Sequence, residues 1–217
     1  MARTITVKGT GKYKASPDCT EIRLDLETVE KEYGSALENE NGKIAKLTDA
    51  VISAGLKEED LKTEFFNVNT EYKSVETKSG RYESVFAGYR VSHSLVLRFD
   101  FDPDKLSEVI TAISCSGVQP GMNIGFTVKD KDAASEAMLK SAVENARRNA
   151  EVLCASSGVT LGDLLSIDYS WGEISLYSPT RYEADLAPRG NGALKCMSFV
   201  PDDVETSDTV TFVWEIK

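Results

Sequence analysis

The sequence has no long apolar run, a single histidine and no excess of basic residues. No stretch of about 18 consecutive apolar residues occurs, so we expect no membrane-spanning helix. The chain carries 25 basic and 35 acidic residues, a formal net charge of −10, and its lysines alternate with acidic residues. Nucleic-acid-binding proteins usually need a clustered basic surface, so we predict no nucleic-acid partner.

Cysteines are also few, and no leader is recognisable. Cys19, Cys115, Cys154 and Cys196 lie far apart, which favours reduced, mostly buried thiols, with a disulfide as the alternative. The opening MARTITVKGTG lacks the apolar core of a signal peptide. As the chain stands we expect a cytoplasmic protein. A periplasmic or cell-envelope location is the alternative if a signal peptide has been removed.

The apolar residues that are present predict an α+β fold. Alternating apolar and polar residues predict strands at 20–28, 63–72, 85–99, 124–128, 164–171 and 209–216. Spacings of three and four predict helices from about Tyr33 to Gly55, from Pro103 to Gly117 and over 132–156. Hairpin strands between helices predict antiparallel or mixed β-sheets with helices packed on one face. Residues 178–195 contain two prolines and two glycines without a period, so we expect a loop there.

The helix over 132–156 carries small residues on its apolar face. Ala142, Ala146 and Ala150 recur every fourth residue, which allows close approach to a sheet. The full face expected to be buried is Leu139, Ala142, Val143, Ala146, Ala150, Leu153 and Cys154.

The segment GTGKYK, Gly9 to Lys14, looks like a phosphate-binding loop but fails both motifs. A dinucleotide loop needs a third glycine where Lys14 stands and a helix afterwards, and a P-loop needs a glycine five residues before Gly11. We interpret Gly9 and Gly11 as a bend or bulge where a strand changes direction, and Lys12 and Lys14 as solvent-exposed.

Two further candidates are better explained by structure. Asp100, Asp102 and Asp104 resemble a calcium loop, but Lys105 and Thr111 stand where that loop needs glycine and glutamate, so Asp102 is read as a helix N-cap. His93, the only histidine, is in phase with apolar neighbours, and we expect it in the core or at a sheet edge. We assign no catalytic, cofactor-binding or metal-ligating residue.

Aromatic residues gather around the predicted hairpin. We expect them to pack in the core, with an interaction surface as the alternative. They are Phe65, Phe66, Tyr72, Tyr82, Phe86 and Tyr89.

The order of several short motifs resembles the SIMPL-domain family from Arg3 to Ile216. The motifs are RTITVKGTGKYKASPD, VISAGLKEEDLKT, AGYRVSHSLVLRF, SSGVTLGDLLSID and VPDDVETSDTVTFVWEI. The resemblance implies one SIMPL-like domain over 1–217 with two intertwined subdomains, about 1–84 plus 160–217, with 85–159 inserted. Members include bacterial periplasmic proteins, and some assemble into large oligomers. No catalytic residues are established for the family.

These observations together predict a non-enzymatic protein without a cofactor that acts by binding or self-assembly. We expect a homo-oligomer, a protein partner as a further option, and a role related to stress or the cell envelope. The alternative is a small-molecule-binding protein, or an enzyme of unassigned type, with a pocket between the subdomains.

Overall fold

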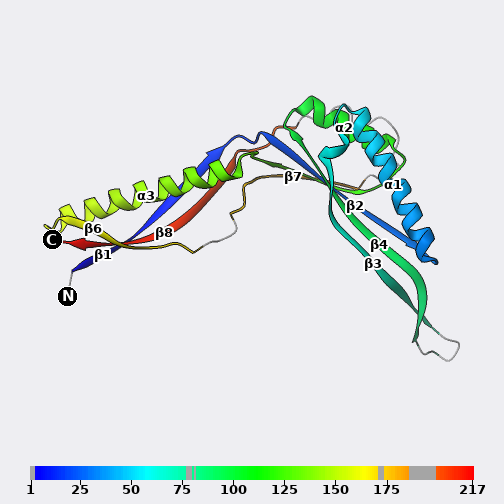
Figure 1. Cartoon of the computed structure of the whole chain (residues 1–217), viewed down its shortest axis with the longest axis horizontal. Coiled ribbons are helices and arrows are strands. Elements are labelled where there is room, and N and C mark those ends of the chain that lie inside the picture. Colours follow the sequence, from blue (N-terminus) through cyan, green and yellow to red (C-terminus); the bar gives the residue numbers. More distant parts are fainter. Residues whose placement is uncertain (1–2, 77–79, 81, 171–173, 186–198) are drawn as a thin grey trace. The chain divides into compact units, whose positions relative to one another are not determined.

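The chain forms two compact units, each built from interleaved segments. The computed structural model describes residues 3–76, 80, 82–170, 174–185 and 199–217 (Figure 1). The described parts of Met1–Asp18, Thr127–Pro179 and Pro201–Lys217 form unit 1, and those of Cys19–Phe126 and Thr180–Val200 form unit 2. The boundaries therefore differ from those expected from the sequence, which fell at 84/85 and 159/160.

Unit 1 is a three-stranded antiparallel sheet with one long helix on it. The sheet has the order β1-β8-β6, formed by β1 (Thr4–Ala15), β8 (Val204–Ile216) and β6 (Leu161–Asp168). Helix α3 (Lys131–Ser156) runs along the sheet, mainly over β1 and β8 (Figure 1). Strand β1 pairs with β8 over its whole length, from Thr4 opposite Glu215 to Ala15 opposite Val204.

Gly9 and Gly11 lie inside strand β1, so the expected bend or bulge is wrong. A Cβ atom at Gly9 would lie 2.6 Å from Ala146 Cβ and closer still to the carbonyl oxygen of Ala142. A Cβ atom at Gly11 would overlap the carbonyl of Met138. The glycines are needed because the backbone of β1 touches the backbone of α3.

The alanines of α3 make this close approach from the other side, as predicted. Ala142, Ala146 and Ala150 are buried against Val7 and Phe212. The predicted apolar face was too wide, because Val143 and Leu153 are about half exposed.

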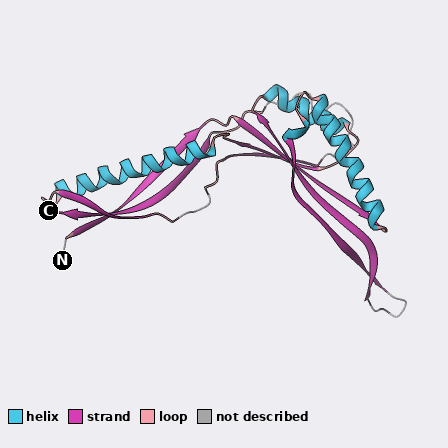
Figure 2. Cartoon of the chain, viewed as in Figure 1, coloured by secondary structure: helices cyan, strands magenta, loops and turns pink. Residues whose placement is uncertain are grey.

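Most of a five-stranded sheet with the order β3-β4-β2-β5-β7 lies in unit 2. Figure 2 shows the strands in magenta and the helices in cyan. The strands of this sheet are β2 (Cys19–Glu30), β3 (Leu61–Glu76), β4 (Tyr82–Asp100), β5 (Gly121–Thr127) and β7 (Tyr177–Asp185). Helices α1 (Tyr33–Ser53) and α2 (Pro103–Cys115) pack on one face of the sheet, as predicted, and a short 3₁₀ turn (Glu58–Asp60) precedes β3. The shared core is formed by apolar side chains of α1, α2, β2, β4 and β5, among them Leu47, Leu106, Leu24, Leu97 and Phe126.

The helix ends follow the expected signals. Asp102 accepts hydrogen bonds from the backbone N–H groups of Asp104 and Lys105, at 2.9 and 3.3 Å, and so caps α2. Gly55, which follows α1, has a φ of 78°, a left-handed conformation that favours glycine. Within the described residues, no helix has the length and apolar character needed to cross a membrane.

Strand β7 occupies the start of the segment expected to be a loop. Tyr182 packs edge-on against Phe126 and Phe199, with ring centroids 6.0 and 5.0 Å away. These contacts come from residues distant in sequence, so no local period could indicate the strand. Residues 186–195 of the predicted loop, and Trp171 of the predicted strand at 164–171, lie outside the described residues.

Candidate functional site

His93 lies at the centre of a buried polar cluster in unit 2. It sits on β4 with 6% of its surface exposed, in the core region predicted for it. Helix α1 faces it with Glu40, which is 1% exposed. Charged side chains are rarely buried to this extent without a specific partner, so the contacts of Glu40 decide what the cluster can do.

The imidazole of His93 faces a different element on each side. Its Nε2 lies 2.9 Å from Thr63 Oγ1 on β3, and its Nδ1 lies 3.7 Å from Glu40 Oε1 on α1. Phe66, also on β3, packs edge-on against the ring with centroids 5.2 Å apart. A neutral ring suits this setting best with its proton on Nδ1, toward the carboxylate, and with Nε2 accepting from Thr63.

The second carboxylate oxygen of Glu40 is held by a separate network. Thr28 Oγ1 on β2 donates to Glu40 Oε2 at 2.5 Å, and Lys43 Nζ donates to Thr28 Oγ1 at 2.6 Å. Lys43 Nζ also donates to the Glu27 carbonyl at 2.7 Å and lies 3.9 Å from Glu40 Oε2. Glu40 Oε1 and His93 Nδ1 are buried and make no hydrogen bond within the described part of the chain.

Burial lowers the pKa of His93, and the neighbouring Glu40 carboxylate opposes this shift in part. The imidazole is therefore neutral at pH 7. A neutral imidazole between a hydroxyl and a carboxylate resembles a catalytic triad, in which Thr63 would be the nucleophile, His93 the base and Glu40 the group that orients the base. The 3.7 Å separation from Glu40 is longer than a hydrogen bond, however, so the geometry favours a structural polar network over a catalytic one.

Glu40 was missed by the sequence analysis, although a signal for it exists. The apolar spacing that predicts α1 takes Tyr33 and Leu37 as its first members, whereas Tyr33 is half exposed. The buried residues are Ala36, Glu40, Leu47, Ala50 and Val51. Glu40 lies four residues after Ala36 and seven before Leu47, so it falls on the same face of the helix as these two residues. This spacing indicates that the Glu40 carboxylate is buried.

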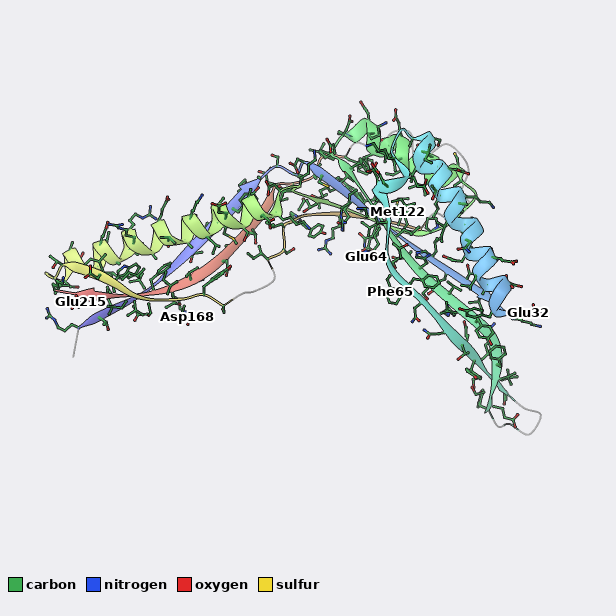
Figure 3. All side chains as sticks on the ribbon, viewed as in Figure 1. Glu32, Glu64, Phe65, Met122, Asp168 and Glu215 are labelled. Carbon is green, nitrogen blue, oxygen red and sulfur yellow. The ribbon has the colours of Figure 1, made fainter. Side chains whose placement is uncertain are left out.

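The hairpin formed by β3 and β4 is the second candidate site. Strand β3 lies at the edge of its sheet, and Figure 3 shows Glu64 and Phe65 on it. A bulge occurs there, between Thr63 and Phe65, in the pairing with β4. Strand β2 ends at Glu30, opposite Tyr89, so the hairpin continues beyond β2 as two strands.

Most aromatic residues of this hairpin are exposed, so the expectation of core packing is wrong for them. Tyr82 is 71% exposed and Tyr72 is 57% exposed, and Phe65, Phe66 and Phe86 are each about half exposed. Their rings contact mainly one another: Tyr72 packs against Phe86, Phe86 against Tyr89, and Tyr89 against Tyr33 of α1. These ring contacts cover only part of each aromatic side chain, so apolar area remains exposed for a partner. A two-stranded ribbon is also only marginally stable by itself, so a partner strand would stabilise it.

The remaining sequence candidates have structural roles or lie apart from these two sites. Lys14 pairs with Asp203 and Glu205 on the surface of unit 1, and Lys12 is exposed. The described residues contain no group of three or more histidine, cysteine or acidic side chains placed to bind a metal. Asp100 ends β4 and Asp102 caps α2, as described above.

Three of the four cysteines lie in the described residues, and one of them lines an open hollow in unit 2. Cys19 and Cys154 are buried, Cys115 is exposed, and Cys196 lies outside the described residues. Cys115 and Lys105 contribute to an open hollow of about 580 Å³ between the end of α1 and α2. Its other lining residues are small or polar, and the small-molecule alternative remains a prediction.

Comparison with known proteins shows which family the chain belongs to. The model of the SIMPL family, described as a protein of unknown function (DUF541), matches residues 5–214. The 26 kDa periplasmic immunogenic protein of Brucella melitensis is 29% identical over 163 residues, which are 75% of this chain and 65% of that protein. This chain thus spans just under two thirds of the Brucella protein.

A second group of relatives covers more of the chain. The uncharacterized protein YggE of Edwardsiella ictaluri is 22% identical over 212 residues, 98% of this chain and 86% of that protein. YggE of Escherichia coli K12 is 21% identical over 188 residues, 85% of this chain and 73% of that protein. These relatives give no support to the expected cytoplasmic location, because the Brucella protein is named as periplasmic.

Proposed function

Since the chain belongs to the SIMPL family, we propose that it is a non-enzymatic protein of the bacterial periplasm that self-assembles through edge strand β3. The periplasmic location is supported by the name of the Brucella relative. Self-assembly is supported chiefly by one observation, the long, exposed and aromatic edge strand of unit 2. Subcellular fractionation of the source organism, with detection by antibody, tests the location.

Strand β3 has the properties that proteins usually avoid at an unprotected sheet edge. It is 16 residues long, and no residue along it is fully buried. An edge of this kind presents unpaired backbone N–H and C=O groups to another strand. Charged residues at an edge usually oppose such pairing, so the arrangement of its charges decides which partner fits.

The charges of β3 fit a second copy of the same strand. In an antiparallel pair, opposite residues share a face of the sheet. If Tyr72 lies opposite Tyr72 of the second copy, then Glu71 lies opposite Lys73 of the second copy, and the reverse pair forms by symmetry. Thr70 then lies opposite Ser74 of the second copy. This register places opposite charges across from each other twice and brings two exposed tyrosines together. Glu71 also pairs with Arg90 of β4 at 2.7 Å, beside a register shift between Glu71 and Tyr72, so Lys73 would add a second cation to this carboxylate.

The register gives a direct test of self-assembly. Sedimentation velocity should show an oligomer for the native chain, and a strict monomer at high concentration would refute the proposal. Lys73→Glu places two glutamates opposite each other in each half of the interface and should weaken association. Lys12→Glu makes the same charge change at an exposed side chain of strand β1 and serves as the matched control. If both variants dissociate equally, net charge and not β3 governs assembly.

A further inference from the structure

The buried cluster around His93 joins the elements that flank strand β4. His93 lies on β4, Glu40 on α1, and Thr63 and Phe66 on edge strand β3. Because His93 is the only histidine of the chain, one side chain accounts for all imidazole titration. A charge change here acts on the contacts of α1 and β3 together.

We propose that His93 is an acid-operated latch: uptake of one proton by its imidazole loosens the docking of helix α1 and edge strand β3 on strand β4. The contacts that carry this proposal are Thr63 Oγ1 at 2.9 Å, Glu40 Oε1 at 3.7 Å and the Phe66 ring at 5.2 Å. All three groups surround a ring that has only 6% of its surface exposed.

Near His93, the negative charge of Glu40 already has a positive partner, Lys43, before the imidazole is protonated. The Glu40 carboxylate accepts from Thr28, and the Lys43 ammonium lies 3.9 Å from it. On β2, Glu30 faces α1 but is hydrogen-bonded by Asn39. A proton on His93 therefore adds a second positive charge beside one carboxylate that Lys43 already neutralises. The β3 side contributes a hydroxyl and an aromatic ring, neither of which carries a compensating charge.

The direction of the pH effect follows from the lowered pKa of His93, which is due first to burial and is only partly offset by Glu40. The unfolded chain takes up the proton more readily than the folded chain. The stabilising contribution is thus fully present above the ordinary histidine pKa of about 6.5 and is lost as the pH falls through the folded pKa. Acid loosens the latch.

The loosening should be local before it is global. Thr63 and Phe66 hold the first half of β3, and Glu40 lies in the first half of α1. Edge strands and helices packed by few contacts open more easily than the central strands of a sheet. Amide hydrogen exchange should therefore show the acid effect in residues 36–47 and 61–68, after correction for the intrinsic pH dependence of exchange.

Two measurements on the full chain test the latch at concentrations low enough to avoid association, so the outcome does not depend on the proposed assembly. In the first, NMR follows the ring Cε1–H signal of the single histidine with pH. We expect a pKa below that of a histidine in an unfolded chain. A pKa above it would overturn the proposal, and this measurement needs no variant.

In the second measurement, urea unfolding is compared at pH 7.5 and 5.5 for the native chain and for His93→Gln. The unfolding constant of the native chain should rise on acidification by on the order of threefold more than that of the variant. An equal rise in both would assign the acid effect to carboxylates and overturn the latch. Glu40→Gln is the matched second variant, because loss of the carboxylate should lower the pKa of His93 further in the same NMR titration.

Discussion

Replacing Gly9 with alanine tests the contact between β1 and α3 on which unit 1 depends. The added methyl group would lie 2.6 Å from Ala146 Cβ and 2.9 Å from its backbone nitrogen. Neither atom can rotate away, since one is backbone and the other is a Cβ fixed to it. Overpacking of a core costs about 1–3 kcal/mol. We expect the upper end of this range, about 3 kcal/mol, because the helix itself must move.

The assay is urea unfolding followed by the fluorescence of Trp214, which is buried in the core of unit 1. Trp171 is changed to phenylalanine in every sample so that Trp214 is the only reporter. The control is Gly42→Ala in α1, where a Cβ atom would meet nothing within 4 Å. Alanine favours a helix over glycine by up to about 1 kcal/mol, so this variant should stabilise unit 2, which circular dichroism of the same samples follows because Trp214 reports only on unit 1. If Gly9→Ala unfolds at the same urea concentration as the native chain, β1 and α3 do not pack as closely as described.

Three further outcomes follow from single contacts. Glu40→Ala removes the acceptor of the buried Thr28 hydroxyl and takes the carboxylate away from the partly exposed Lys43 ammonium. The free energy of unfolding should fall by about 2 kcal/mol, and by less in Glu40→Gln, as urea titration would show. Asp102→Ala removes the cap of α2 and should cost about 1 kcal/mol in thermal or urea unfolding, whereas Asp102→Asn should restore most of it. With Cys196 changed to serine, a thiol reagent should label Cys115 rapidly in the native protein and the two other cysteines only in denaturant; rapid labelling of all three would contradict the burial described for them.

The sequence alone was sufficient for the elements with a clear period. The alanine stripe of α3 predicted a helix lying close on a sheet, and Ala142, Ala146 and Ala150 are buried in that contact. The alternating apolar and polar residues of the strand around His93 likewise predicted that this histidine is buried. Both predictions succeeded because burial on one face imposes a period that can be recognised without knowing the partner.

The predictions that failed concern residues whose role depends on a distant partner. Gly9 and Gly11 looked like a turn because glycine is common in turns, but they are spaced to admit α3, which lies more than 120 residues later in the sequence. The strand β7 was missed because Tyr182 is ordered by Phe126 and Phe199. The aromatic residues of the hairpin were expected in a core because the sequence does not show that β3 is an edge strand or that the hairpin extends beyond β2.

The candidate site was only half predictable. The phase of His93 was correct, whereas Glu40 was absent from the expected helix stripe. A buried acid breaks the apolar pattern on which prediction relies, so Glu40 and its contacts with Thr28 and His93 were not predicted. Pairing between Glu40 and Thr28 also joins elements separated by a turn, and no periodic signal reports it.

The pairing of β1 with β8 has a consequence for how the protein is made. Strand β1 is synthesised early, yet its partner follows only after the whole of residues 16–203. Contacts between such distant segments form slowly, since a long loop must close first. The glycines of β1 have no helix against them until α3, residues 131–156, has been made. Unit 1 therefore cannot complete its sheet until β8 has been synthesised, and β1 has no strand partner while residues 16–203 are made.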